Sequence, residues 1–294
     1  MAGLGGLTRL LERLATAVEG ASALDAPADA AKKVTSLIPR GPVKDALSGT
    51  AVGHPVHPAA VVVPMGAIGS AALLDVAGSD PRAVRLLTTT GVVGALPAVL
   101  TGWSDWNETN GAERRVGLVH AAGNAVGLGL VAGSLLTDRP AVRRSLSLAG
   151  LAVISGAGWL GGHLSFALGV GVDTTAFLKP PTDWTDACAE TDVRADKAMA
   201  VTVVDTPVLL VRRPQGIVAI GDRCTHRGAP LHEGDIEDGC VVCPWHGARF
   251  SLDDGSLVRG PATRPEAVFE VRVSGDRVEV RRAEERALRL NPTS

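Results

Sequence analysis

The sequence predicts a multidomain chain, in which an all-α four-helix transmembrane bundle precedes a smaller metal-binding domain. Two observations carry this prediction. Residues 58–171 contain four long apolar runs that are separated by strongly polar breaks. Residues 224–246 then bring two cysteines and two histidines together in a short stretch. A length of 294 residues leaves room for two domains.

Residues 1–50 are predicted to form an amphipathic or peripheral helical region. Apolar residues recur there at helical spacing, and Arg9, Glu12 and Arg13 fall mostly on another face. The apolar positions are Leu4, Leu7, Leu10, Leu11, Leu14 and Val18. Such a helix can lie on a membrane surface or dock on partner helices, and the sequence leaves both open.

Residues 51–172 are predicted to form four transmembrane helices, over about 58–77, 84–102, 116–136 and 146–171. Each run approaches the roughly 20 apolar residues that a helix needs to cross a bilayer. A soluble four-helix bundle is the alternative, but its helices would need a polar face, which these runs almost lack. The sequence therefore predicts a multi-pass protein of the cell membrane, surrounded by the lipid bilayer.

Small residues within these runs predict close helix packing. Gly123 and Gly127 have small-xxx-small spacing, as do Gly158 and Gly162. Such spacing lets two helices approach closely in lipid.

Residues 224–246 contain one Cys-x-His pair, Cys224 and His226, and one Cys-x-x-His pair, Cys243 and His246. Two thiolates can hold one iron and two neutral imidazoles a second, which is the mixed ligation of a Rieske [2Fe–2S] centre. The rival interpretation is a tetrahedral Cys2His2 zinc site. Zinc-finger spacing groups the cysteines together and the histidines together, whereas each pair here mixes the two. The pattern therefore favours an iron–sulfur cluster.

The residues around these pairs resemble Rieske ferredoxins and the electron-transfer domains of Rieske oxygenases, over about residues 186–285. The resemblance lies in Cys224-Thr-His226-Arg-Gly228-Ala-Pro230, in Cys243-Pro-Trp245-His246-Gly247 and in Gly260-Pro261-Ala262. It implies an all-β iron–sulfur domain over 191–285. By that resemblance Cys224 and Cys243 bind the inner iron, and His226 and His246 bind the outer, more exposed iron. The implied cluster environment is Gly228, Pro230, Trp245, Gly247 and Pro261, the last in a proline loop over the cluster.

The resemblance also predicts a low redox potential. High-potential centres of cytochrome bc complexes carry a disulfide between these loops, where Ala229 and Trp245 stand here. Those centres also carry a serine and a tyrosine that donate hydrogen bonds to the sulfurs, where Ala248 and Phe250 stand here. Such bonds stabilise the more negative reduced cluster and raise its potential. Their loss predicts the low end of the Rieske range, roughly −150 mV.

Three histidines of the helical part, His57, His120 and His163, are predicted to lie near one end of the bundle, because alternate helices of an up-and-down bundle start and end there. Ionisable residues inside a membrane are costly and indicate function. Two histidines on neighbouring helices can ligate one haem b. Structural hydrogen bonds or caps, and binding of a quinone, are the alternatives, and all remain open.

The motif Gly53-His54-Pro55-Val56-His57-Pro58, followed by Asp75, resembles an uncharacterised bacterial family of four-helix membrane domains. The resemblance covers about residues 50–172. Some members of that family carry a C-terminal Rieske domain. It implies the architecture and brings no activity with it.

The Rieske domain is predicted to be cytoplasmic. Arg9, Arg13, Lys32 and Lys33 place the N-terminus inside by the positive-inside rule, and four spans return the chain to the same side. The run Arg143-Arg144 loosely resembles a twin-arginine export signal and argues for the opposite side. Four cysteines without a disulfide framework favour a reducing compartment.

The predicted function is a membrane-anchored, low-potential electron carrier, rather than a complete enzyme, that exchanges single electrons with an unidentified redox protein or quinone. A complete oxygenase needs a mononuclear iron site of two histidines and a carboxylate, for which no grouping remains outside the cluster. The alternatives are an electron-transfer component of an oxygenase, part of a quinone- or haem-linked membrane oxidoreductase, and a redox sensor. A net charge of −2 and 3% aromatic residues predict no nucleic-acid partner. Residues 173–190 are predicted as a linker and 286–294 as a tail.

Overall fold

The computed structural model describes residues 4–195 and 197–283, and these form two compact units. The helical unit consists of residues 4–48 and 55–172, and the second unit of residues 49–54 and 173–283. The predicted tail at 286–294 lies outside the described residues.

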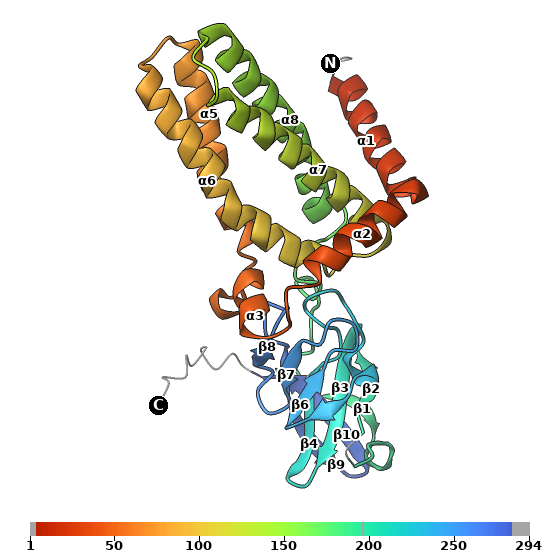
Figure 1. Cartoon of the computed structure of the whole chain (residues 1–294). Helices are drawn as coiled ribbons and strands as arrows, with labels where there is room; N and C mark the ends of the chain where they lie inside the picture. The colour runs from red at the N-terminus through yellow and green to blue at the C-terminus, as the bar shows by residue number, and fades with distance from the viewer. Residues whose placement is uncertain (1–3, 196, 284–294) are drawn as a thin grey trace, which may run out of the picture. The chain divides into compact units, whose positions relative to one another are not determined.

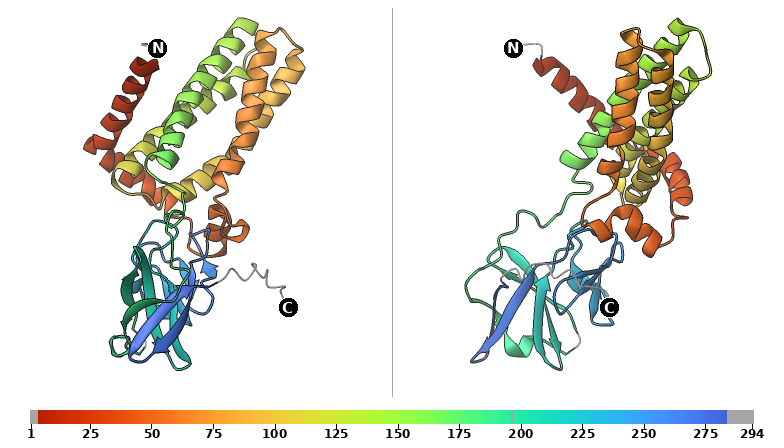
Figure 2. Two further views of the ribbon diagram at one scale, coloured as in Figure 1. Left: turned by 180° about the vertical axis from the view of Figure 1, so that it is seen from behind. Right: turned by 90° about the vertical axis from the view of Figure 1, so that its left-hand side faces the viewer.

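The helical unit contains three N-terminal helices and then the helices of the predicted bundle (Figure 1). The first three are α1 (Leu4–Gly20), α2 (Asp25–Thr35) and α3 (Pro42–Ser48). The others are α4 (His57–Ala60), α5 (Val62–Val76), α6 (Pro81–Trp106), α7 (Gly111–Ser134) and α8 (Pro140–Phe166). Views from two further sides show α5 beside α6 and α7 beside α8 (Figure 2).

Four segments of this unit are long and apolar enough to cross a membrane, with mean hydropathies from 1.3 to 1.8: His57–Val76, α6, α7 and α8. The helices α6 and α8 begin several residues before the predicted apolar runs. Pro81 and Pro140 occupy their first turns, where a missing N–H costs nothing. The polar residues that follow each proline are therefore helical, although the apolar pattern has not yet begun.

Glycines bring α7 and α8 together. A Cβ added to Gly127 would lie 2.8 Å from the carbonyl oxygen of Gly150, and one added to Gly123 would lie 3.0 Å from the Cβ of Ala157. Gly123 and Gly127 thus face α8, as their spacing predicts, whereas nothing lies within 4 Å of a Cβ on Gly158. Among residues 4–195 and 197–283, no neighbouring helix packs against Gly158, so the second small-residue pair does not form a contact of this kind.

A buried ion pair joins the end of α5 to the start of α8. The Arg143 guanidinium donates to Asp75 Oδ1 at 2.6 Å, and both side chains are almost fully buried. A buried charge is tolerated only with such a partner. Asp75, which the sequence placed in the membrane family's pattern, is thus a packing residue of the bundle.

The second unit is built from two antiparallel sheets. The six-stranded sheet has the order β1-β10-β9-β4-β3-β2 and the four-stranded sheet the order β5-β6-β7-β8. The strands of the first sheet are β1 (Thr185–Ala189), β2 (Met199–Val203), β3 (Thr206–Arg213), β4 (Gly216–Gly221), β9 (Val268–Ser274) and β10 (Arg277–Arg282). Those of the second are β5 (Ile236–Glu237), β6 (Cys240–Val242), β7 (Arg249–Ser251) and β8 (Leu257–Arg259).

The predicted linker at 173–190 includes strand β1. Asp186 pairs with Glu279 of β10, and Cys188 is buried in one of the unit's two cores. The sequence showed a loop-like stretch there because the strand is only five residues long and follows a run rich in proline and threonine. The last residues of the predicted linker therefore belong to the six-stranded sheet, and the segment before β1 is shorter than the predicted linker.

Candidate metal centre

Two loops of the second unit carry the paired cysteines and histidines, and both loops use the same backbone design. In the first, the Cys224 N–H donates to the Ala229 carbonyl at 2.9 Å and the Gly228 N–H to the Cys224 carbonyl at 2.8 Å. In the second, Cys243 N–H donates to the Ala248 carbonyl at 2.8 Å and Gly247 N–H to the Cys243 carbonyl at 3.0 Å. In each loop, the backbone N–H and carbonyl of the cysteine are thus hydrogen-bonded within the loop, and the two cysteines have equivalent backbone environments.

Glycine is needed where each loop turns back. Gly228 and Gly247 have φ values of 76° and 74°, in the left-handed region that other residues rarely adopt. The second loop joins β6 to β7, which pair through Val242 and Arg249. The sheet therefore fixes where that loop projects.

The two thiols lie side by side in one buried core. Cys224 and Cys243 are 1% and 2% exposed, and they belong to the same core cluster as Phe250. Their mutual hydrogen bond, together with backbone N–H groups of the second loop, lowers the pKa of Cys243 to about 6. The same bond, together with burial, raises the pKa of Cys224. The pair thus readily supplies a thiolate, which is the form that binds metal.

The two imidazoles also lie side by side. The ring centroids of His226 and His246 are 5.0 Å apart, with the planes at 82°. Both Nδ1 atoms are buried, and no hydrogen bond reaches either atom from the part of the chain that the structure describes, although each side chain makes other contacts. Buried polar atoms are almost always satisfied. Two adjacent imidazole nitrogens in this state fit a metal ligand pair.

This arrangement fits a two-iron cluster better than a single zinc ion. Thiol lies against thiol and imidazole against imidazole, as two irons with different ligands require. A tetrahedral zinc site would bring all four side chains to one point. Among residues 4–195 and 197–283, no three His, Cys, Asp or Glu side chains gather around one such point.

A third loop covers the first ligand loop. Pro261 and its neighbours Gly260 and Ala262 are buried. Thr225, between the two ligands of the first loop, donates its N–H to Glu266 at 2.9 Å and its hydroxyl to the Arg264 carbonyl at 2.9 Å. Burial raises the pKa of Glu266 well above its ordinary value. The proline loop is therefore anchored directly to the first ligand loop.

Sequence reasoning missed several polar residues that support these loops. The Thr174 hydroxyl donates to the Cys224 carbonyl at 2.8 Å. His232 is half-buried and contacts the buried Asp222 at 2.7 Å through Nδ1. Burial raises the pKa of Asp222, and the hydrogen bonds from His232 oppose that shift. Single polar residues in loops give no spacing signal that could have identified them.

The remaining predicted neighbours differ in exposure. Trp245 is 53% exposed and its ring lies 6.4 Å from that of His246. Pro230 pairs with Arg223 through an isolated bridge. Ala229, Ala248 and Phe250 are fully buried. The solvent-exposed aromatic surface thus lies next to a histidine, and the cysteines face the core.

The three histidines of the helical unit fall into two kinds. His57 Nδ1 lies 2.9 Å from the Ala98 carbonyl oxygen, and His120 Nδ1 lies 2.7 Å from that of Ala157. His163 instead meets Glu19 of α1 through Nε2, at 2.7 Å. The predicted group of three is therefore reduced to one matched pair and one histidine that binds the amphipathic helix.

Comparison with known proteins identifies the second unit. The model of the Rieske [2Fe-2S] domain matches residues 183–282. The anthranilate 1,2-dioxygenase ferredoxin subunit of Burkholderia cepacia is 32% identical over 98 residues, which are 33% of this chain and 91% of the ferredoxin. The iron-sulfur subunit of the toluene-4-sulfonate monooxygenase system of Comamonas testosteroni is 44% identical over 79 residues, 26% of this chain and 22% of that subunit.

A solved complex of reduced oxygenase and oxidized ferredoxin in carbazole 1,9a-dioxygenase contains a chain that is 33% identical, with a TM-score of 0.32; the match covers 33% of this chain and 92% of that one. The chain spans about a fifth of the length of the first curated relatives, 22% and 18%, and most of the length of the small ferredoxins. Through residues 183–282, the chain belongs to the Rieske [2Fe-2S] domain family.

Proposed function

We propose that this protein is a membrane-anchored electron carrier in which Cys224, His226, Cys243 and His246 hold a [2Fe–2S] cluster. The observation that carries the proposal is the pairing within the two ligand loops, thiol beside thiol and imidazole beside imidazole. When bound, such a cluster supplies reversible one-electron chemistry.

The four proposed ligands differ in burial, and their roles differ accordingly. Cys224 and Cys243 hold the inner iron from within the core, where they are almost completely buried. His226 and His246 are half-exposed and hold the outer iron. Single electrons enter and leave along this histidine edge, with Trp245 as the exposed contact surface. The cluster environment of Gly228, Pro230, Gly247 and Pro261 shapes the loops and excludes water from the thiolates.

The potential of this centre lies at the low end of the Rieske range, roughly −150 mV. Ala248 and Phe250 are fully buried beside the ligand loops and have no side-chain hydrogen-bond donor. The reduced state therefore receives little extra stabilisation. A low-potential centre fits delivery of electrons to an acceptor better than oxidation of a quinol.

The partner is another redox protein. The relatives include a ferredoxin subunit of a dioxygenase and an iron-sulfur subunit of a monooxygenase system. The cluster unit here would occupy the corresponding place between an electron donor and an oxygenase or similar acceptor. The four apolar helices tether it to the cell membrane, with the cluster unit on the cytoplasmic side. A quinone- or haem-linked oxidoreductase is the second candidate, which the matched contacts of His57 and His120 favour.

The ligand assignment is tested by electron paramagnetic resonance. Reduced wild-type protein should give a Rieske-type spectrum, and His246→Ala should abolish it, because one iron loses an imidazole. His54→Ala is the control, since His54 belongs to the same unit but is exposed and lies outside both ligand loops. An unchanged spectrum in His246→Ala would remove the assignment.

A further inference from the structure

After the three N-terminal helices, the helical unit contains two copies of one helical hairpin, α4 to α6 and α7 to α8. In the second helix of each hairpin, the same residues recur 59 positions apart. These pairs are Pro81 and Pro140, Arg85 and Arg144, Gly91 and Gly150, Ala98 and Ala157, and Gly102 and Gly161. In the first helix, His57 and Asp75 recur as His120 and Asp138, and the aspartate follows the histidine by eighteen positions in both copies.

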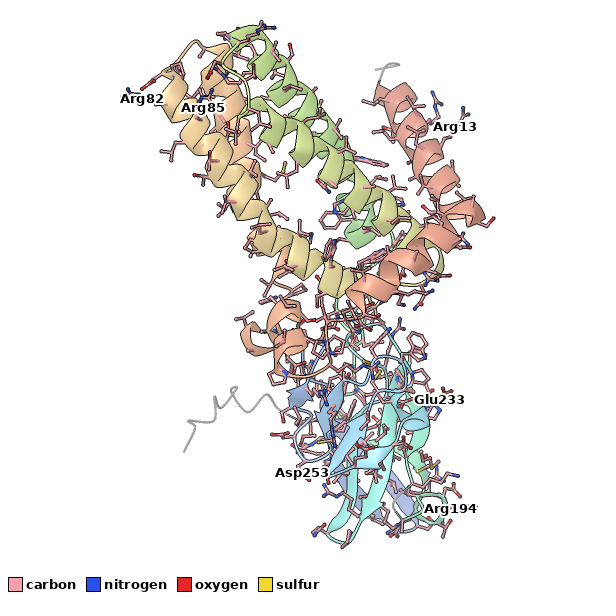
Figure 3. The ribbon with its side chains drawn as sticks, viewed as in Figure 1. Arg13, Arg82, Arg85, Arg194, Glu233 and Asp253 are labelled. Atoms are coloured by element: carbon pink, nitrogen blue, oxygen red, sulfur yellow. The ribbon has the colours of Figure 1, made fainter. Side chains whose placement is uncertain are left out.

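Contacts between the hairpins repeat in both directions. Arg85 donates to the carbonyl of Thr137 at 3.0 Å and to Asp138 at 2.7 Å. Arg144 donates to the Asp75 carbonyl at 2.5 Å. Figure 3 labels Arg85 at the α5–α6 end of the unit, where these contacts lie. Each arginine thus binds the far end of the other hairpin's first helix, as a local twofold axis between the hairpins requires.

The two histidines share one environment within this repeat. The carbonyls that they meet, those of Ala98 and Ala157, are equivalent, and so are the glycines against their rings. A Cβ on Gly102 would lie 2.9 Å from His57 Cε1, and a Cβ on Gly161 would lie 2.8 Å from His120 Cε1. Each imidazole is therefore held flat against the neighbouring helix, by a hydrogen bond on one nitrogen and by a glycine beside the ring.

These hydrogen bonds fix the tautomer of both rings. A carbonyl oxygen can only accept, so Nδ1 carries the proton and Nε2 carries the lone pair. Metal-binding histidines are oriented in this same way, by donating the other ring N–H to a carbonyl. Within the described parts of the chain His57 Nε2 makes no hydrogen bond. His120 Nε2 is approached at 3.3 Å by the Asn124 amide, which also donates to the His120 carbonyl at 2.9 Å.

The two rings form a pair that excludes His163. The residue equivalent to His163 in the first hairpin is Ser104, and His163 itself binds Glu19 through Nε2. The twofold relation therefore matches His57 with His120 and leaves His163 without an equivalent histidine.

The tightly packed core of the unit lies at another level. Its buried cluster of Ile68, Val131 and Ile154 begins eleven residues after each histidine, about 16 Å along the helices. At the histidine level the buried positions of the second helices include Ala98, Thr101 and Ala157. In both hairpins, an alanine and a glycine of the second helix thus meet the imidazole.

We infer that His57 and His120 are the two axial ligands of one haem bound between the hairpins. A haem supplies four of its six iron ligands itself and needs only two from the protein. A bare metal ion needs three or four protein ligands, and no such group occurs among the residues that the structure describes. Two neutral imidazoles in an apolar, twofold setting therefore match a haem and leave a simple metal ion under-coordinated. The site lies wholly in the helical unit and does not depend on the cluster.

The test measures haem in the full-length protein, expressed with ample haem precursor and purified in detergent. The pyridine haemochrome assay should give one haem per chain, with the optical spectrum of a six-coordinate, low-spin iron. His57→Ala and His120→Ala should each lose that spectrum. His54→Ala and His163→Ala are the matched controls and should keep it, because neither residue is part of the repeated pair.

Three results would overturn the inference: wild-type protein without a Soret band, haem that persists in the His57→Ala/His120→Ala double variant, or a stoichiometric metal ion without porphyrin. His120→Met distinguishes loss of a ligand from misfolding. A thioether still ligates iron, so this variant should keep the haem and show a shifted spectrum. The reduced cluster's paramagnetic signal is read in the same samples. A cluster signal without haem rejects this site alone, and haem without a cluster signal rejects the proposed function alone.

Discussion

Cys224 and Cys243 occupy the same place in two loops with one hydrogen-bond pattern. Gly228 and Gly247 close these loops, and their positive φ values explain why each glycine follows its cysteine by four residues. The thiols are buried and the imidazoles half-exposed. At the residue scale, burial therefore decides which side chains protect the centre and which ones can exchange electrons with a partner.

The first residue-scale prediction concerns the potential. Phe250 is fully buried in the core that contains both thiols, so Phe250→Tyr places a hydroxyl donor beside the ligand loops. A hydrogen bond worth about 1.5 kcal/mol more to the reduced state should raise the midpoint by roughly 60 mV. Protein-film voltammetry measures the shift. Phe250→Leu, which adds no donor, should leave the midpoint almost unchanged, and an equal rise in both variants would contradict the explanation.

At the scale of elements, the helical hairpin is the repeated unit. Prolines begin α6 and α8 at equivalent positions, and glycines allow close approach at equivalent positions. Packing is asymmetric in one respect, because Asp75 is buried by Arg143 whereas Asp138 is fully exposed. The two hairpins therefore share a backbone design and differ in their side-chain anchors.

The small-residue contact between α7 and α8 gives an element-scale prediction. Gly127→Ala would press a methyl group against the Gly150 carbonyl, which is backbone and cannot rotate away. We expect a loss of about 1–3 kcal/mol in the free energy of unfolding, seen as a lower thermal midpoint in detergent. Gly129→Ala, on the same helix with nothing within 4 Å, is the control. Similar midpoints for the two variants would show that this contact contributes little.

At the scale of the whole molecule, the chain joins a unit of four apolar helices to a Rieske domain. Only 22–33% of the most apolar window of each long helix is buried within the protein. Large apolar side chains such as Leu73, Leu86 and Phe166 are consequently exposed. Exposure of so many apolar side chains to water is unfavourable, so the surrounding medium that suits these helices is lipid.

Membrane anchoring is tested by extraction. The full-length protein should stay in the membrane pellet through an alkaline carbonate wash and leave it only with detergent, because its apolar helices would have to enter water otherwise. Sidedness is measured with Asp253→Cys, an exposed position of the Rieske unit labelled in Figure 3. A membrane-impermeant maleimide should label this cysteine only after the cells are opened. Release by carbonate would contradict anchoring, and labelling of intact cells would reverse the orientation.

The order of the parts and the nature of the cluster domain follow from the amino-acid sequence. A helical region followed by an all-β Rieske domain was predicted from apolar runs and from residues 224–246, and this prediction is confirmed. Both signals are local, since a span needs consecutive apolar residues and the ligand pairs lie within short loops. The roles of the four ligands, membrane insertion and haem binding stay predictions.

The contacts between residues that are distant in the sequence follow from the packed fold. Strand β1 was predicted as linker because its partner β10 lies about ninety residues away in the sequence. Thr174 and Glu266 support the first ligand loop from segments that carry no motif. The separation of His57 and His120 from His163 required knowing which carbonyl or carboxylate each ring meets. Spacing along the chain fixes local geometry, but only the packed fold sets the contacts that choose a residue's partner and its tautomer.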